Sequence, residues 1–167
     1  LITAGPCTSN SELAKRYKIH SGKKNERPDP LLDFILKEVD DRTSVIDIGA
    51  GSGRWTIPLA RKAKTVTVIE PSVPMIDNLL GNIAAAGLNN IQIIRSSWED
   101  AVVEPHKITL CSHAMYGCPD LPAFINAMVE ATRKTCFMLL RAPDRDGVMA
   151  EAAMRIWGQP HDSPNFQ

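Results

Sequence analysis

Short runs of β-branched and other apolar residues alternate along this chain with longer segments in which apolar residues recur every three or four positions. The short runs occupy residues 44–48, 65–69, 91–94, 107–111 and 135–140. Runs of this length and composition predict buried strands, and the segments between them predict amphipathic helices. A regular alternation of strand and helix is typical of a parallel sheet covered by helices, an α/β domain.

The predicted helices cover residues 31–39, 54–63, 72–86, 121–134 and 148–157. Pro30 and Gly87 are suitable start and stop signals for two of them. Pro58 lies inside the second and removes one backbone hydrogen bond, so its first turn should be irregular. Residues 1–30 are polar and interrupted by glycine and proline, and we expect them to form an N-terminal cap or loop segment before one domain over residues 31–167.

A glycine-rich turn follows the first strand and precedes a helix. Gly49, Gly51 and Gly53 stand directly after residues 44–48, and this arrangement opens a βαβ unit that can hold a nucleotide-like cofactor against the backbone. The spacing differs from the G-x-G-x-x-G of dinucleotide sites. Asp47 lies two residues before the first glycine, where its carboxylate would repel a pyrophosphate and attract an ammonium or sulfonium. The turn therefore favours S-adenosylmethionine over NAD, which stays the alternative cofactor.

The segment from Val45 to Trp55 also resembles the first motif of class I S-adenosylmethionine-dependent methyltransferases, and further matches follow in order from about Leu31 to Leu140. The resemblance implies a three-layer Rossmann-like fold, mainly of parallel strands in the order 3-2-1-4-5. That fold has seven strands, and only five are predicted here. An uncovered parallel edge is a hazard, so we suspect that the native chain continues past Gln167 or that residues are missing.

An acid at the end of the second strand is the next candidate. Glu70 lies 21 residues after Gly49, close to the ~20 residues typical of an acid that accepts hydrogen bonds from ribose hydroxyls. In the resembled family the end of the third strand commonly binds the adenine amino group. An Asp is usual where Ser97 stands, so that contact can pass to Trp98 or Glu99; Trp98 as a core residue is the competing interpretation. The complete predicted cofactor set is Asp47, Gly49, Ala50, Gly51, Gly53, Glu70, Pro71, Ser72, Ser97, Trp98, Glu99, Ser112 and His113.

Candidate catalytic residues lie in the loop after the fourth strand. His113 and Tyr116 should lie beside the methionine end of the cofactor, because parallel strands bring their carboxyl ends to one edge. A histidine can exchange a proton near neutral pH, although a role in the pocket wall alone is the competing interpretation for both residues. Cys111, His113 and Cys118 lack the spacing of known zinc sites, so no metal is predicted.

Charge and composition suggest where the protein works and what it methylates. Lys plus Arg and Asp plus Glu both number 19, which gives no overall field toward nucleic acid or acidic membranes. No apolar run approaches the ~20 residues that span a bilayer, and four irregularly spaced cysteines favour reduced thiols and a cytoplasmic location. We therefore expect a methyltransferase with a small-molecule acceptor and S-adenosylhomocysteine as product, with nucleic acid as an unlikely partner. The alternatives are a non-catalytic S-adenosylmethionine-binding protein and a methyltransferase for protein or nucleic acid.

Overall fold

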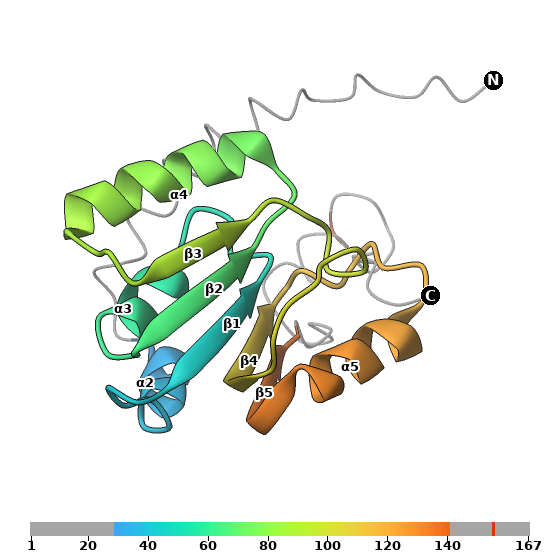
Figure 1. The fold of residues 1–167 in the computed structure, drawn as a ribbon. Coiled ribbons are helices and arrows are strands. Elements are labelled where there is room, and N and C mark those ends of the chain that lie inside the picture. The colour runs from blue at the N-terminus through green and yellow to red at the C-terminus, as the bar shows by residue number, and fades with distance from the viewer. Residues whose placement is uncertain (1–28, 141–154, 156–167) are drawn as a thin grey trace.

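The computed structural model describes residues 29–140 and Arg155. Within them, five strands form one parallel sheet in the order β3-β2-β1-β4-β5, as predicted (Figure 1). The strands are β1 (Ser44–Ile48), β2 (Thr65–Ile69), β3 (Ile91–Ile94), β4 (His106–Ser112) and β5 (Thr132–Leu139). The chain leaves β1 toward β2 on one side, and β4 pairs with its other side. The carboxyl end of β1 is therefore a topological switch point, where α/β sheets bind their ligands.

Helices cover both faces of this sheet. They are α2 (Pro30–Leu36), α3 (Thr56–Ala60), α4 (Val73–Ala86) and α5 (Leu121–Glu130). Residues of α2, α3 and α4 pack in one buried cluster with Val45 and Val66. Residues of α5 pack in a second cluster with Ile46 and Ile69. Because side chains alternate along a strand, consecutive residues of β1 face different helix layers.

Several predicted boundaries are confirmed and others are wrong. The bounds of β1, β2 and β3 agree with the predicted runs, and Gly87 ends α4 in the left-handed conformation. The helix predicted over residues 54–63 is the short α3, and Pro58 accounts for its late start at Thr56, because proline has no N–H to donate to the carbonyl of Arg54. The stripe predicted over residues 31–39 gives a helix only as far as Leu36. The apolar residue Leu80 of α4, which is one of the recurring apolar positions of this helix, is 49% exposed.

The junction between α5 and β5 departs most from prediction. The helix was expected to reach Lys134, but it ends at Glu130, and β5 begins at Thr132 instead of residue 135. The Thr132 hydroxyl donates to the Met128 carbonyl and is also hydrogen-bonded to the Thr109 hydroxyl (2.7 Å), and Thr132 pairs with His106 in β4. Pairing with the neighbouring strand thus overrides the local helical pattern.

Two predictions fall on other parts of the chain. The N-terminal segment up to residue 28 and the helix predicted over residues 148–157, apart from Arg155, lie outside the described residues. The boundary between a cap segment and the domain stays a prediction. In the described part of the chain, no helix has the length and apolar character needed to cross a bilayer.

Candidate active site

A pocket of about 580 Å³ lies at the carboxyl ends of β1 to β4. Its volume falls within the ~300–1,000 Å³ typical of small-molecule sites. Most of the predicted cofactor residues line it: Gly49, Ala50, Gly51, Glu70, Pro71, Ser72, Ser97, Trp98, Glu99, Ser112 and His113. Asp47 and Gly53 do not line it. The topology thus brings segments far apart in sequence to one cavity.

The three glycines of the turn all have positive φ angles, but each has a different neighbour. A Cβ on Gly49 would lie 2.2 Å from the Ala114 Cβ, so this glycine lets the loop after β4 press against the turn. A Cβ on Gly53 would lie 2.5 Å from the Leu79 Cδ1, so this glycine lets α4 pack closely. A Cβ on Gly51 would meet nothing within 4 Å, and Gly51 lines the pocket. Gly51 is therefore the glycine that leaves room for a ligand.

The Glu70 carboxylate joins the glycine turn to the start of α4. Its Oε2 accepts a hydrogen bond from the Gly51 N–H (2.8 Å), and its Oε1 accepts one from the Ser72 N–H (2.9 Å). Glu70 is 6% exposed, so this strand-end acid is buried rather than solvated. Each carboxylate oxygen has a second acceptor position, which suits the two vicinal hydroxyls of a ribose. Ser72 occupies the N-cap position of α4, but its side chain makes no capping bond.

Asp47 lies beneath the turn rather than in the pocket. It is 1% exposed and accepts a hydrogen bond from the Thr56 hydroxyl at the start of α3. Burial raises the pKa of Asp47 to about 6; hydrogen bonds from Thr56 oppose this rise, and the Glu70 charge adds to it. Asp47 does not line the pocket, so any effect that it has on a bound cofactor acts through its charge and through the shape of the turn.

Replacing Asp47 by asparagine should change how stability depends on pH. Because the folded-state pKa lies above the unfolded value of 3.8, this group stabilises the fold at low pH, and the contribution is lost as pH rises through about 6. Relative to wild type, the Asp47→Asn protein should gain about 1–2 kcal/mol of unfolding free energy between pH 5 and pH 8. Urea denaturation of both proteins at the two pH values measures this difference. A difference that does not change with pH would contradict the expectation.

The residues after β3 that were predicted to contact adenine line the pocket, and Trp98 among them is also part of the buried core. The Trp98 side chain is 7% exposed, and its indole N–H donates to the Phe124 carbonyl (3.1 Å). Its ring also packs against Phe124 with centroids 6.2 Å apart. The Ser97 hydroxyl donates to the Asp100 carboxylate (2.7 Å), and Glu99 is exposed. The indole N–H is thus already bonded within the protein, and Ser97 and Glu99 supply the polar side chains of this wall.

The loop after β4 holds the two predicted catalytic residues together. His113 Nδ1 and the Tyr116 hydroxyl are hydrogen-bonded at 2.7 Å, and their rings stack with centroids 5.7 Å apart. His113 lines the pocket, whereas Tyr116 does not. His113 has a φ angle of 59°, and the 1% exposed Met115 anchors the loop in the core. Tyr116 can therefore orient His113. Within the described ranges, no three His, Cys, Asp or Glu side chains are grouped to hold a metal.

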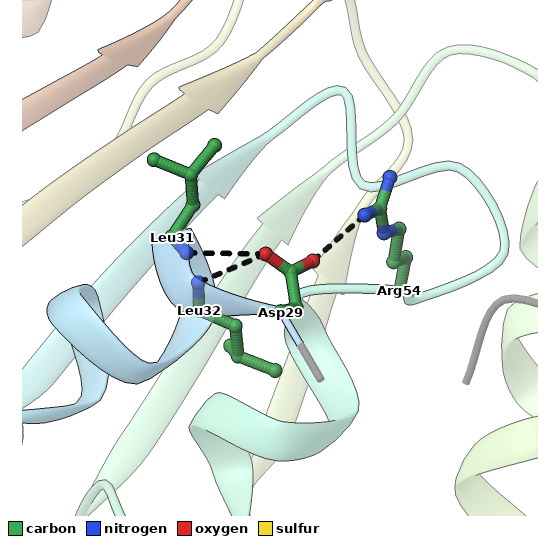
Figure 2. Close-up of polar contacts among 4 residues, drawn as sticks. All are labelled: Asp29, Leu31, Leu32 and Arg54. Atoms are coloured by element: carbon green, nitrogen blue, oxygen red, sulfur yellow. Dashed lines mark hydrogen bonds and ion pairs between the residues drawn. The ribbon is translucent and has the colours of Figure 1, made fainter. Parts of the chain in front are cut away.

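Other residues of the wall were not predicted. Arg54, Met75, Cys118 and Phe124 line the pocket. Arg54 forms an ion pair with Asp29 (2.7 Å), and the same aspartate caps α2 through bonds to the Leu31 and Leu32 N–H groups (Figure 2). Arg54 follows Gly53 directly, so the glycine turn could have identified it as a pocket residue. Its ion-pair partner Asp29 lies 25 residues earlier in the sequence, and the local pattern does not reveal it.

The fold and the pocket together define a class of protein. A parallel sheet of order 3-2-1-4-5, an open glycine turn and an acid at the end of β2 are the arrangement of a Rossmann-like methyltransferase domain. The open side of Gly51 and the paired oxygens of Glu70 fit S-adenosylmethionine. A family model described as a methyltransferase domain matches residues 45–135. The chain belongs to this family, which is one of the class I S-adenosylmethionine-dependent methyltransferases.

Similar proteins support the same class. A probable ribosomal RNA small subunit methyltransferase A from Methanosphaera stadtmanae is 33% identical over 94 residues, which cover 53% of this chain and 35% of that protein. A tRNA/tmRNA (uracil-C(5))-methyltransferase from Vibrio atlanticus is 25% identical over 119 residues, which cover 71% of this chain and 30% of that protein. The chain thus spans about a third of the length of these curated relatives.

A solved structure shows the same fold. The crystal structure of a putative S-adenosylmethionine-dependent methyltransferase from Methanococcus maripaludis matches with a TM-score of 0.65 and 19% identity. The match covers 93% of this chain and 76% of that one. The fold predicted from the resemblance is therefore confirmed.

The relatives correct one prediction. They are named as enzymes of ribosomal and transfer RNA, so the expectation that nucleic acid is an unlikely partner is wrong, and the choice of a small-molecule acceptor has no support from them. The error came from the balanced net charge, which is a sum over the chain. RNA contacts depend on local charge, which this sum does not describe.

Proposed function

We propose that this chain is the catalytic domain of an S-adenosylmethionine-dependent RNA methyltransferase. The observation that carries the proposal is the similarity to ribosomal and transfer RNA methyltransferases, over 94 and 119 residues respectively. The loop after β4 supports a catalytic role, because His113 borders the same cavity as Glu70. A cytoplasmic location, consistent with the free thiols of Cys111, Cys118 and Cys136, belongs to this proposal.

The described residues have separate tasks in such a transfer. Bound S-adenosylmethionine supplies an electrophilic methyl group for in-line displacement. Glu70 accepts hydrogen bonds from the ribose hydroxyls, and Ser97 and Glu99 contact the adenine side. His113, oriented by Tyr116, positions the acceptor base or takes its proton. The chain thus contributes binding, orientation and one group for proton transfer.

Labelling of RNA tests the proposal. The protein is incubated with S-adenosylmethionine carrying a deuterated methyl group and with ribosomal and transfer RNA transcribed in vitro, which lack modifications. We expect one methylated nucleoside with the mass shift of the label, identified by mass spectrometry after digestion. The Glu70→Ala variant is the matched control and should give little label. Binding of S-adenosylhomocysteine without label in either RNA would contradict the RNA acceptor.

A further inference from the structure

Arg54 brings a positive charge to a pocket whose other charged walls are acidic. Of the described residues that line the pocket, Arg54 is the one Lys or Arg, and Glu70 and Glu99 are the acids. Its side chain is 44% exposed, and Arg54 is among the residues that line the cavity. A guanidinium has five N–H donors in a planar fork that matches a carboxylate or phosphate. The charge therefore suits an anionic group of a ligand.

Two contacts fix the direction of the Arg54 side chain. Nη2 pairs with the Asp29 Oδ2 at 2.7 Å, and Cζ lies 5.4 Å from the centre of the Trp55 ring. Asp29 itself is fixed, because its Oδ1 caps α2. Figure 2 shows the Asp29 carboxylate between the start of α2 and the Arg54 guanidinium. The bond to Asp29 occupies one edge of the guanidinium and leaves further N–H donors for a ligand.

The packing of α2 indicates at which end of the pocket Arg54 lies. The Phe34 ring of α2 meets the Phe137 ring of β5 edge to face at 6.2 Å. β5 pairs with β4, whereas Glu70 follows β2 on the opposite side of β1. The ion pair with Asp29 ties Arg54 to the start of α2, and the Phe34 ring of this helix lies against β5, on the side of β1 opposite to β2 and the ribose acid. The end of S-adenosylmethionine remote from its ribose and adenine is the amino-acid end, which carries a carboxylate and an ammonium.

We infer that Arg54 binds the carboxylate of the cofactor's amino-acid end and that Asp29 is the positioning residue that aims it. The buried Asp47 supplies a negative charge that favours the neighbouring ammonium. The carboxylate and the ammonium of the amino-acid end are thus each attracted by a residue of opposite charge. This inference rests on the cofactor-binding part of the proposed function and not on the RNA acceptor.

Isothermal titration of the Arg54→Gln protein with two ligands tests the inference. The ligands are S-adenosylhomocysteine and its decarboxylated form, which differ only in the carboxylate. We expect Arg54→Gln to weaken S-adenosylhomocysteine binding about tenfold or more, as for a charge-assisted bond, and to leave the affinity for the decarboxylated form nearly unchanged. Equal losses for both ligands would overturn the inference. An unchanged affinity for both, with weaker and less salt-dependent RNA binding, would overturn it in favour of a phosphate contact.

The Asp29→Ser protein tests the positioning role. Serine also serves as an N-cap, so α2 keeps its cap while Arg54 loses its partner. We expect a smaller loss of S-adenosylhomocysteine affinity, and no added loss in the Arg54→Gln background, because Asp29 acts through Arg54. Additive losses or tighter binding would overturn this role. Thermal midpoints should stay near wild type, since exposed ion pairs contribute little to folding.

The outcomes for the inference and for the proposed function are separable. If wild type does not bind S-adenosylhomocysteine, both fail. The titrations with S-adenosylhomocysteine contain no RNA. An absence of RNA methylation would therefore overturn only the proposal that RNA is the methyl acceptor, and the conclusion about Arg54 would stand.

Discussion

Replacement of Glu70 by alanine is expected to weaken S-adenosylhomocysteine binding by about 2–4 kcal/mol, which is about 30- to 1,000-fold in the dissociation constant. The carboxylate lies in the pocket wall and is 6% exposed. Hydrogen bonds from two ribose hydroxyls to this buried, charged acceptor would be among the stronger polar contacts of the site. Isothermal titration of wild-type and variant proteins measures the loss.

Glu70 also holds the backbone, so the experiment needs a control for pocket shape. Alanine removes the acceptors of the Gly51 and Ser72 N–H groups, which can distort the turn without any ribose contact. Titration with the 2′-deoxy form of the ligand separates these effects. The loss caused by Glu70→Ala should be much smaller for the deoxy ligand, since one of the bonds is already absent. Equal losses for both ligands would assign Glu70 a structural role only.

The strands next to the pocket were predictable because local pattern and tertiary environment agree there. β1 and β2 are central, and helices cover both of their faces, so short runs rich in β-branched residues mark their bounds. β5 is different, because Thr132 belongs to the strand through its pairing with His106 and its hydrogen bond with Thr109. Both partners lie in β4, and the helical pattern of residues 121–134 does not reveal them.

The residues of the site divide in the same way: those marked by a local sequence pattern were predictable, and those placed by contacts with distant segments were not. The spacing from Gly49 to Glu70 predicted which strand ends form the pocket, because parallel topology brings them to one edge. The direction of Asp47 was not predictable, because both faces of β1 are covered and an apolar run does not say which face lies under α3. The pair of Arg54 and Asp29 joins residues 25 positions apart and has no local pattern. An acceptor as large as RNA is recognised by a surface, which net charge does not describe.

Replacement of His113 by asparagine together with Tyr116 by phenylalanine is expected to lower the rate of methyl transfer by about 100-fold or more. The reason is that His113 lines the pocket and its ring is held by the Tyr116 hydroxyl at 2.7 Å. Asparagine suits position 113 because the φ angle there is 59°, in the left-handed region that asparagine tolerates better than alanine. Single-turnover assays measure the rate, and titration should show S-adenosylhomocysteine affinity within a few-fold of wild type.

The single Tyr116→Phe variant separates orientation from packing. Phenylalanine keeps a ring to stack on His113 but removes the hydroxyl that bonds Nδ1. If His113 positions the acceptor or takes its proton, losing this bond should lower the rate of methyl transfer, because the ring is no longer held at the pocket wall. A rate equal to that of wild type would show that stacking alone is enough to hold the His113 ring. A double variant with wild-type turnover would remove both residues from the reaction and leave them as part of the pocket wall.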